Sequence, residues 1–399
     1  MTLDVRDGQS SLIPAPGAAG RRGERDAAMV RRALDLATEG LATARPNPIV
    51  GAVVVAGDRV VGEGYHRRCG EPHAEMNALA VAGARAAGAT LYVSLEPCAH
   101  TGRTPPCVEG LGAAGLARVV VPALDPDARV FGRGVRALRA AGVEVTLGCL
   151  EAEAVLHNLA YYRERLGWSR TVTLKLAVSA DGKLAREPGR RDRVTGDQAD
   201  RLVHRLRAAH DCVVVGAETA RVDRPLLDCR RLDAEERGAD PVPVVLDSQL
   251  RLPGDNRWSV LGRPYVVLCT GAASGERVRA LERAGARVVR CEAEQGGVSI
   301  AAALDALEAM GLRRVLVEGG AAVFGSFLRS ELWDAFYRFQ SRERFGARGV
   351  SVAGDGANAP EGAVRIDAGA LGEDELVRFV RASTLTAIVS RLRAAGGEA

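Results

Sequence analysis

Lysine is nearly absent from this chain of 399 residues, although lysines and arginines together number 54. Its only lysines are Lys175 and Lys183, which lie close together in a chain that otherwise carries its positive charge on arginine. This placement indicates a local requirement for an ammonium group, with chance as the alternative.

Aromatic residues and long apolar runs are scarce as well. Aromatics make up 4% of the chain, which leaves few platforms on which the bases of a single strand could stack. We find no apolar signal segment and no run of 18 apolar residues that could span a membrane. The net charge of +4 is scattered, which favours a mixed solvated surface over a nucleic-acid face. We therefore expect a cytoplasmic protein that binds neither nucleic acid nor a membrane.

The eight cysteines do not form a disulfide framework. Apart from Cys98 and Cys107 they are scattered, as reduced thiols of a cytoplasmic protein would be. Hydrophobic residues make up 47% and charged residues 26%, as in soluble globular proteins, and the length favours two domains. Residues 1–24 are rich in Gly, Pro, Ser and Arg and are expected to form a disordered tail.

Apolar periodicity and turn residues predict a first α/β domain over residues 25–149. Expected helices cover residues 26–40, 74–87, 107–114 and 135–141, and expected strands cover residues 49–56, 60–64, 90–95, 118–122 and 143–147. Gly57-Asp58 predicts a hairpin between the first two strands.

A helical connector over residues 150–169 leads to a second α/β domain over residues 170–399. Its expected strands are 172–178, 212–215, 242–246, 265–269, 287–289 and 315–317, and its expected helices are 197–209, 276–284, 299–310 and 320–329. Residues 350–374 are expected to be loop, with closing strands at 376–382 and 384–390.

One group of residues predicts a catalytic zinc site. His73, Cys98 and Cys107 offer one imidazole and two thiols, which can bind zinc and leave its fourth tetrahedral position to water. Cys107 opens an expected helix, where a thiolate is favoured. Glu75 can carry protons without binding the metal, as in zinc nucleobase deaminases. His73 and Glu75 normally face apart at this spacing on a helix, but in a first turn both can reach one pocket.

Two other interpretations of this group remain. Cys98 and Cys107 could be an inert core pair or a disulfide. The zinc site could also be structural and closed by a fourth protein ligand, for which His100 is the candidate.

The motif resembles the bifunctional deaminase/reductase family of riboflavin biosynthesis. Plain cytidine and tRNA deaminases usually place only two residues between their cysteines, whereas this chain has a longer insert. The resemblance implies a cytidine-deaminase-like three-layer α/β/α domain followed by a dihydrofolate-reductase-like α/β domain. The matching segments are His73-Ala74-Glu75, Pro97-Cys98-Ala99-His100-Thr101-Gly102-Arg103-Thr104-Pro105-Pro106-Cys107, Pro46-Asn47-Pro48, Gly62-Glu63-Gly64-Tyr65-His66 and Val317-Glu318-Gly319-Gly320.

For the first domain, the resemblance implies deamination of 2,5-diamino-6-ribosylamino-4(3H)-pyrimidinone 5′-phosphate. The zinc ligands would be His73, Cys98 and Cys107, and Glu75 would be the catalytic proton shuttle. The substrate-binding residues would be Asn47, His66 and His100.

For the second domain, the resemblance implies reduction of the ribosyl group with NADPH, in a homodimer. Arg207 and Arg230 could hold a ribose phosphate, and Glu318 could hold a pyrimidine ring. Gly319 and Gly320, at a strand end before a helix, could offer backbone N–H groups to a phosphate. The implied substrate residues are Lys175, Arg207, Leu227, Arg230 and Glu318, and the implied cofactor residues are Ala177, Thr195, Thr219, Asp223, Gly319 and Gly320.

The second domain also departs from the family pattern. Arginines stand where the family has Ser-x-Trp, and the Trp normally lies beside the nicotinamide. A deaminase with a degenerate reductase-like scaffold is therefore an alternative, and a non-catalytic zinc- or nucleotide-binding scaffold is another. The departing positions are Arg191, Arg193, Arg224, Asp228 and Ala335.

Overall fold

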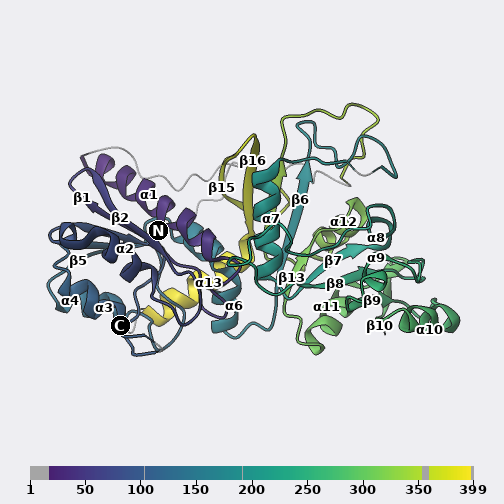
Figure 1. Ribbon diagram of the computed structural model, residues 1–399, viewed down its shortest axis with the longest axis horizontal. Coiled ribbons are helices and arrows are strands. Elements are labelled where there is room, and N and C mark those ends of the chain that lie inside the picture. Colours follow the sequence, from purple (N-terminus) through teal and green to yellow (C-terminus); the bar gives the residue numbers. More distant parts are fainter. Residues whose placement is uncertain (1–17, 103, 191, 353–358, 397–399) are drawn as a thin grey trace.

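The computed structural model describes residues 18–102, 104–190, 192–352 and 359–396. It contains two α/β halves that lie side by side (Figure 1). The first half holds a five-stranded sheet of order β2-β1-β3-β4-β5. The second holds a nine-stranded sheet of order β10-β9-β8-β7-β13-β6-β14-β16-β15. The predicted α/β class with two successive halves is confirmed.

The first sheet is mixed. Strand β1 pairs antiparallel with β2 and with β3, whereas β3, β4 and β5 run parallel. Its central strands are rich in valine because both faces are covered by helices. The elements are α1 (Ala18–Ala37), β1 (Gly51–Ala56), β2 (Arg59–Tyr65), α2 (Ala74–Ala82), β3 (Thr90–Val93), α3 (Cys107–Ala113), β4 (Arg118–Val121), α4 (Arg133–Ala140) and β5 (Glu144–Leu147), with short 3-10 turns at Thr38–Gly40 and Gly83–Ala86.

Two glycines let helices approach the first sheet closely. A Cβ on Gly51 would lie 2.0 Å from the carbonyl oxygen of Ala33 in α1, and one on Gly62 would lie 2.2 Å from that of Ala78 in α2. Helix α1 covers one face of the sheet, and α2, α3 and α4 cover the other. Helix α1 begins earlier than expected, so residues 18–24 of the expected tail are helical, and residues 1–17 lie outside the described residues.

The connector is two helices rather than one. Helix α5 (Glu151–His157) and helix α6 (Leu159–Arg165) are separated at Asn158. The Asn158 side chain accepts from the backbone N–H of Ile49 at 2.9 Å and donates to the Ile49 carbonyl at 2.9 Å. This long-range pairing fixes the break, which no local sequence signal marked. Both helices pack on the same face of the first sheet as α1.

In the second sheet, all neighbouring strands from β10 to β14 run parallel. Strand β16 pairs antiparallel with β14, and β15 pairs antiparallel with β16. The elements are β6 (Thr171–Val178), α7 (Asp197–Ala209), β7 (Cys212–Gly216), α8 (Ala217–Val222), β8 (Val242–Leu246), α9 (Arg257–Val260), β9 (Tyr265–Cys269), α10 (Gly275–Arg283), β10 (Ala286–Arg290), α11 (Ile300–Ala309), β13 (Arg314–Val317), α12 (Ala321–Ser330), β14 (Ala335–Gln340), β15 (Ala363–Leu371), β16 (Asp374–Arg381) and α13 (Ala382–Gly396), with a small hairpin of β11 (Ala293–Glu294) and β12 (Gly297–Val298).

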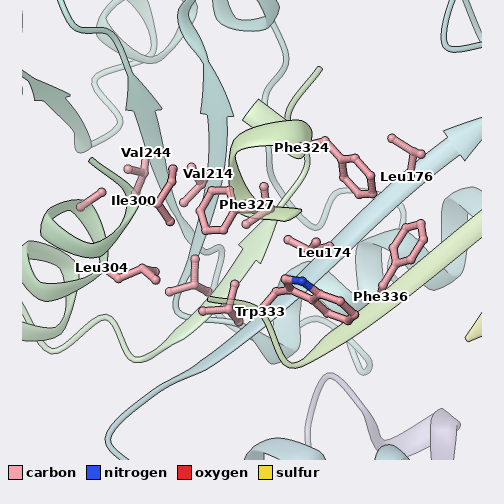
Figure 2. Packing of buried hydrophobic residues seen from close by; sticks show 14 of the residues in the cluster. Leu174, Leu176, Val214, Val244, Ile300, Leu304, Phe324, Phe327, Trp333 and Phe336 are labelled. Carbon is pink, nitrogen blue, oxygen red and sulfur yellow. The ribbon is translucent and has the colours of Figure 1, made fainter. Parts of the chain in front are cut away.

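Helices α11 and α12 cover one face of this sheet. Figure 2 shows Ile300 and Leu304 of α11, and Phe324 and Phe327 of α12, packed against strand residues such as Leu174. All five side chains are at most 4% exposed. This packing holds β6 and β13 in place, and these strands carry residues of the second candidate site.

The C-terminal segment differs from the sequence prediction. Within residues 350–374, expected to be loop, β15 forms a strand, and residues 353–358 lie outside the described residues. The predicted strand at 384–390 is wrong, because these residues belong to α13. Ile388 and Leu392 of α13 are buried against the core of the first half, and this packing overrides the β preference of Thr and Val. Strand β14 was not expected at all.

Candidate active sites

Three possible zinc ligands come from two helix starts and a loop of the first half. His73 is the residue before α2 and has an extended backbone, with φ of −72° and ψ of 165°. Because His73 lies outside the helix, its side chain need not point away from Glu75 in the first turn. Cys107 is the first residue of α3, and Cys98 lies in the loop that follows β3.

The three donor groups converge. His73 Nδ1 lies 3.2 Å from Cys107 Sγ and 3.5 Å from Cys98 Sγ, and all three ligand atoms are within 4.8 Å of one another. His73 Nε2 lies 3.4 Å from Thr104 Oγ1, so the Nδ1 atom faces the thiols. One imidazole and two thiols at this separation fit a zinc ion. The cluster does not include His100, and all eight cysteines, which fall in the described part of the chain, remain thiols.

The two thiols differ in acidity. A hydrogen bond from Cys107 lowers the pKa of Cys98 to about 4, although burial opposes this shift. The same hydrogen bond, together with burial, raises the pKa of Cys107. This hydrogen bond therefore shifts the pKa values of the two thiols in opposite directions.

Glu75 is a buried carboxyl group next to this cluster. It is 3% exposed, and its Oε2 atom has no hydrogen-bond partner in the described part of the chain. Burial raises the pKa of Glu75 to about 6, against the opposing charge of His73. A buried oxygen without a partner is rare in folded proteins, and here it is available to a ligand.

Asn47 and His66 are paired beside the cluster. Asn47 Nδ2 lies 3.0 Å from His66 Nε2, and His66 Nδ1 lies 3.3 Å from the Pro72 carbonyl. The rings of His66 and His73 meet edge-on with centroids 5.2 Å apart. His100 Nδ1 is buried and has no hydrogen-bond partner among the described residues. The structure thus places Asn47 and His66 next to the zinc cluster.

In the second half, Lys175, Arg207 and Glu318 form a largely covered charge cluster, with side chains 17%, 12% and 7% exposed. Glu318 follows β13 and accepts from Arg207 Nε at 2.6 Å and Arg207 Nη2 at 2.9 Å, and Lys175 Nζ lies 3.7 Å away. Burial would raise the pKa of Glu318, but the positive charges of Arg207 and Lys175 hold it at about 2. The carboxylate is therefore ionised at neutral pH and keeps both cations in place. Desolvation lowers the pKa of Lys175.

Leu227 and Arg230 lie on the segment after α8. Leu227 is 2% exposed and has a positive φ of 52°, which is costly for a residue with a branched side chain. Arg230 is ion-paired with Asp228, and Arg207 Nη1 donates to the Asp228 carbonyl at 3.2 Å. Arg207 therefore connects this segment to Glu318.

A cleft of about 700 Å³ lies at the carboxyl ends of β7, β8 and β13, between α8 and α12. Three of the predicted cofactor residues, Thr219, Asp223 and Gly320, line it. Ala177, Thr195 and Gly319 are not among its lining residues. The sequence reasoning missed Ser248 and Arg251. Their position after β8 was a usable signal, since ligands of such sheets bind beyond the carboxyl ends of strands.

The departing residues are held by local contacts. Arg193 donates to Asp197 at 2.6 Å and to Asp200 at 3.2 Å, and Arg224 has a positive φ of 43°. Ala335 is buried at the start of β14. Arg191 lies outside the described residues.

Each half of the chain matches a known protein family. Residues 23–123 match the family model "Cytidine and deoxycytidylate deaminase zinc-binding region", and residues 170–365 match "RibD C-terminal domain". The chain is 38% identical over 306 residues to the riboflavin biosynthesis protein RibD of Bacillus amyloliquefaciens, covering 76% of this chain and 81% of the relative. It is 35% identical to RibD of Aquifex aeolicus, covering 90% of this chain and 99% of the relative.

Solved structures agree. The Thermotoga maritima diaminohydroxyphosphoribosylaminopyrimidine deaminase/5-amino-6-(5-phosphoribosylamino)uracil reductase is 32% identical with a TM-score of 0.61, and the match covers 90% of this chain and 99% of that one. Acinetobacter baumannii RibD is 33% identical with a TM-score of 0.58 and the same coverage. No helix among the described residues has the length and apolarity that a membrane crossing requires.

Proposed function

Because the chain belongs to the RibD family of bifunctional deaminase/reductases of riboflavin biosynthesis, we propose specific residues for each of its two reactions. The first half deaminates 2,5-diamino-6-ribosylamino-4(3H)-pyrimidinone 5′-phosphate, and the second reduces the ribosyl group of the product with NADPH. The observation that carries the first assignment is the convergence of His73, Cys98 and Cys107 beside the unpartnered Oε2 of Glu75.

In the deaminase half, His73, Cys98 and Cys107 hold zinc. The ion supplies Lewis-acid activation of water. Glu75 Oε2 accepts one proton from the attacking water and passes it to the ring nitrogen. It then accepts the second proton, from the hydroxyl now bound to carbon, and passes it to the departing amine, so that the C–N bond breaks, the carbonyl forms and ammonia leaves. Glu75 is suited to this role because its carboxyl group is buried beside the cluster and no described residue forms a hydrogen bond with Oε2.

Asn47 and His66 orient the pyrimidine. If the Asn47 amide nitrogen donates to His66 Nε2, its Oδ1 is left to accept from the substrate. His100, whose Nδ1 lacks a protein partner, contacts the substrate from the loop between the two cysteines.

In the reductase half, the cleft lined by Thr219, Asp223 and Gly320 receives the cofactor, which supplies hydride. Gly320 stands just before α12, where the backbone N–H groups of a helix start favour a phosphate. Glu318 accepts from the pyrimidine ring, and Arg230 binds the ribose phosphate. Ala177, Thr195 and Gly319 are proposed cofactor contacts, and Lys175, Arg207 and Leu227 substrate contacts.

The remaining assignments concern the whole chain. We assign residues 25–149 to the deaminase domain, 150–169 to the connector and 170–399 to the reductase domain. The protein acts in the cytoplasm as a homodimer on a small pyrimidine nucleotide.

The test follows each reaction separately. Zinc-loaded protein is incubated anaerobically with the diamino substrate and NADPH, and ammonia and absorbance at 340 nm are recorded. We expect ammonia release first and NADPH oxidation after it. A chelator should abolish ammonia release but not the oxidation of NADPH by substrate that is already deaminated. Absence of ammonia from the zinc-loaded protein would refute the deaminase assignment.

A further inference from the structure

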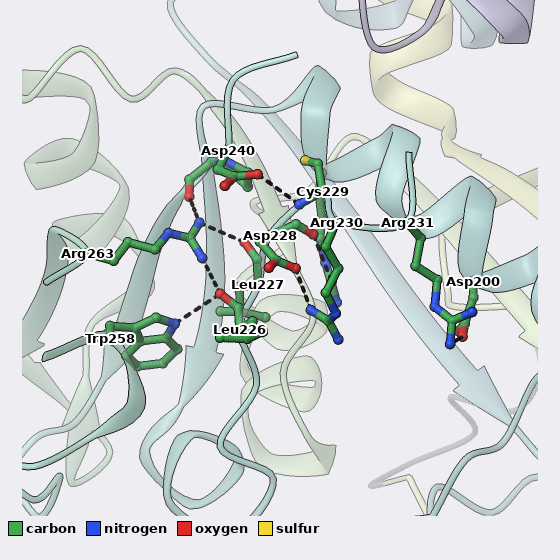
Figure 3. Close-up of polar contacts among 12 residues, drawn as sticks. Asp200, Leu226, Leu227, Asp228, Cys229, Arg230, Arg231, Asp240, Trp258 and Arg263 are labelled. Atoms are coloured by element: carbon green, nitrogen blue, oxygen red, sulfur yellow. Dashed lines mark hydrogen bonds and ion pairs between the residues drawn. The ribbon is translucent and has the colours of Figure 1, made fainter. Parts of the chain in front are cut away.

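The proposed phosphate contact of the reductase half is occupied by a carboxylate of the same chain. Residues 226–231, here called the 226–231 loop, follow α8 and include both Asp228 and Arg230. The guanidinium of Arg230 is paired with the carboxylate of Asp228 (Figure 3). The Asp228 side chain is 14% exposed and that of Arg230 is 44% exposed, so Arg230 can be reached from solvent while Asp228 is largely covered.

This pair differs from a mobile surface ion pair because the backbone on either side of Asp228 is held. Figure 3 shows how side chains from distant segments converge on the 226–231 loop. Arg263 donates to the carbonyl oxygens of Leu226 and Leu227, and Trp258 Nε1 donates to the Leu226 carbonyl at 3.1 Å. Arg207 Nη1 donates to the Asp228 carbonyl at 3.2 Å, and the Cys229 N–H donates to Asp240 Oδ1 at 2.9 Å. Little side-chain or backbone freedom is lost when the pair forms, so the carboxylate is an effective competitor.

The neighbouring cations are also matched by carboxylates. Lys175 and Arg207 share Glu318, and Arg231 is paired with Asp197 at 3.2 Å and with Asp200 at 3.4 Å. An incoming phosphate therefore meets a region whose positive charge is already largely balanced. Its bidentate contact with Arg230 requires that Asp228 give way.

His204 lies in the same region and does not supply the missing charge. It is 5% exposed, and no described residue forms a hydrogen bond with its Nδ1. Burial, followed by the charges of Arg207 and Arg230, lowers the pKa of His204 to about 4, so the ring is neutral at pH 7. Arg230 thus remains the cation for which the phosphate and Asp228 compete.

We propose that Asp228 is a specificity-determining residue, which competes with the 5′-phosphate of the substrate for Arg230 and so weakens binding of phosphorylated substrate to the reductase half. This inference rests on the proposed role of Arg230 as the phosphate contact. Removal of the Asp228 charge frees Arg230 and removes a repulsion from the phosphate dianion.

The direct test measures binding without turnover. Ribose 5-phosphate is titrated calorimetrically into full-length zinc-loaded wild-type protein and into Asp228→Asn, which keeps the side-chain shape. We expect about fivefold tighter binding by the variant at low ionic strength, which is the scale of a charge pair near a surface. The gain should shrink as salt is added. Asp228→Ser provides a second variant in case the amide perturbs the loop.

Two matched variants make the test specific. In an Arg230→Gln background, Asp228→Asn should produce a clearly smaller gain, because the cation for which the groups compete is absent and only the repulsion between Asp228 and the phosphate is removed. Asp233→Asn removes a carboxylate that pairs with Arg201 and is 76% exposed, and it should leave the affinity unchanged. The KM for the deaminated, phosphorylated substrate should fall about fivefold in Asp228→Asn, with kcat and the KM of the dephosphorylated analogue within about twofold.

Unchanged or weaker binding by both Asp228 variants would overturn the inference, as would an equal gain in the Arg230→Gln background. Failure of the proposed reductase activity gives a different result. In that case no NADPH is oxidised by any variant, while tighter ribose 5-phosphate binding by Asp228→Asn still supports the competition.

Discussion

At the scale of single residues, the deaminase site depends on a carboxyl group that is buried away from solvent. Glu75 lies at the start of α2, two positions after a possible zinc ligand, and its Oε2 has no protein partner. Burial of such a group costs stability unless a ligand uses it, which is typical of a functional site. The role of Glu75 can therefore be tested separately from metal binding.

Replacement of Glu75 by Gln should abolish proton transfer but keep the zinc ligands. We expect ammonia release to fall by at least about 100-fold, the usual contribution of a positioned general acid or base. Zinc content, measured by atomic absorption on the purified protein, should stay at one ion per chain. Loss of zinc together with activity would show that Glu75 acts through the metal site.

The Glu318 carboxylate is the corresponding single residue of the second half. Glu318→Gln leaves the buried cations Lys175 and Arg207 without a counter-charge. Removal of one member of a buried ion pair typically costs about 3–5 kcal/mol, and we expect a loss of that size in urea unfolding of the second half. Glu282→Gln, on the exposed face of α10, is the control and should change stability by less than about 0.5 kcal/mol.

At the scale of secondary-structure elements, α13 connects the two halves. It follows β16 of the second sheet, yet Ile388 and Leu392 belong to the same buried cluster as Val30 and Leu34 of α1. Figure 1 shows α13 reaching from the second half into the first. The C-terminal helix thus completes the core of the half that bears the zinc site.

Ile388→Ala should therefore destabilise the deaminase half, although the residue is distant from it in sequence. Ile388 is fully buried, and truncation of such a side chain typically costs about 2–5 kcal/mol. We expect ammonia-releasing activity to be lost at a lower temperature after heating. Thr386→Ala, on the exposed side of the same helix, should match the wild type. Equal heat resistance of all three proteins would exclude this role for α13.

At the scale of the whole molecule, charged side chains tie the halves together. Arg45 of the first half pairs with Asp211 of the second at 2.8 Å, and Arg163 of the connector pairs with Asp334 at 2.9 Å. His210 lies next to Asp211, between α7 and β7. Its Nδ1 lies 2.6 Å from the Leu206 carbonyl, which requires an N–H on that nitrogen.

This partly buried histidine predicts a loss of stability in acid. Burial lowers the pKa of His210 to about 4, with smaller effects from the charges of Arg314, Asp211 and Arg45. Between pH 4 and 6.5 the unfolded chain binds a proton that the folded chain does not, so stability falls as the pH decreases through this window.

The prediction is measured by urea unfolding at pH 7.5 and pH 5. His210→Asn keeps an amide donor for the Leu206 carbonyl but cannot titrate. We expect the loss of stability between these pH values to be smaller in the variant by roughly 2 kcal/mol. An identical pH dependence in both proteins would contradict the assignment.

The zinc cluster could be found from sequence because local structure places its parts. His73 and Cys107 stand at helix starts, and Cys98 follows a strand of the same sheet, so short-range patterns bring the ligands together. The valine-rich strands were equally clear, since burial on both faces leaves a continuous apolar run. These features determined the deaminase half and the α/β class of both halves.

Other features were decided only by contacts between distant segments. Asn158 breaks the connector because it pairs with Ile49, and α13 is helical because the first sheet offers it a hydrophobic face. The pairing of Arg230 with Asp228 depends on a loop whose backbone is held by Trp258 of α9 and by Arg263, which lies between α9 and β9. Sequence patterns record the preferences of a segment, whereas these outcomes depend on which partner the tertiary structure brings within reach.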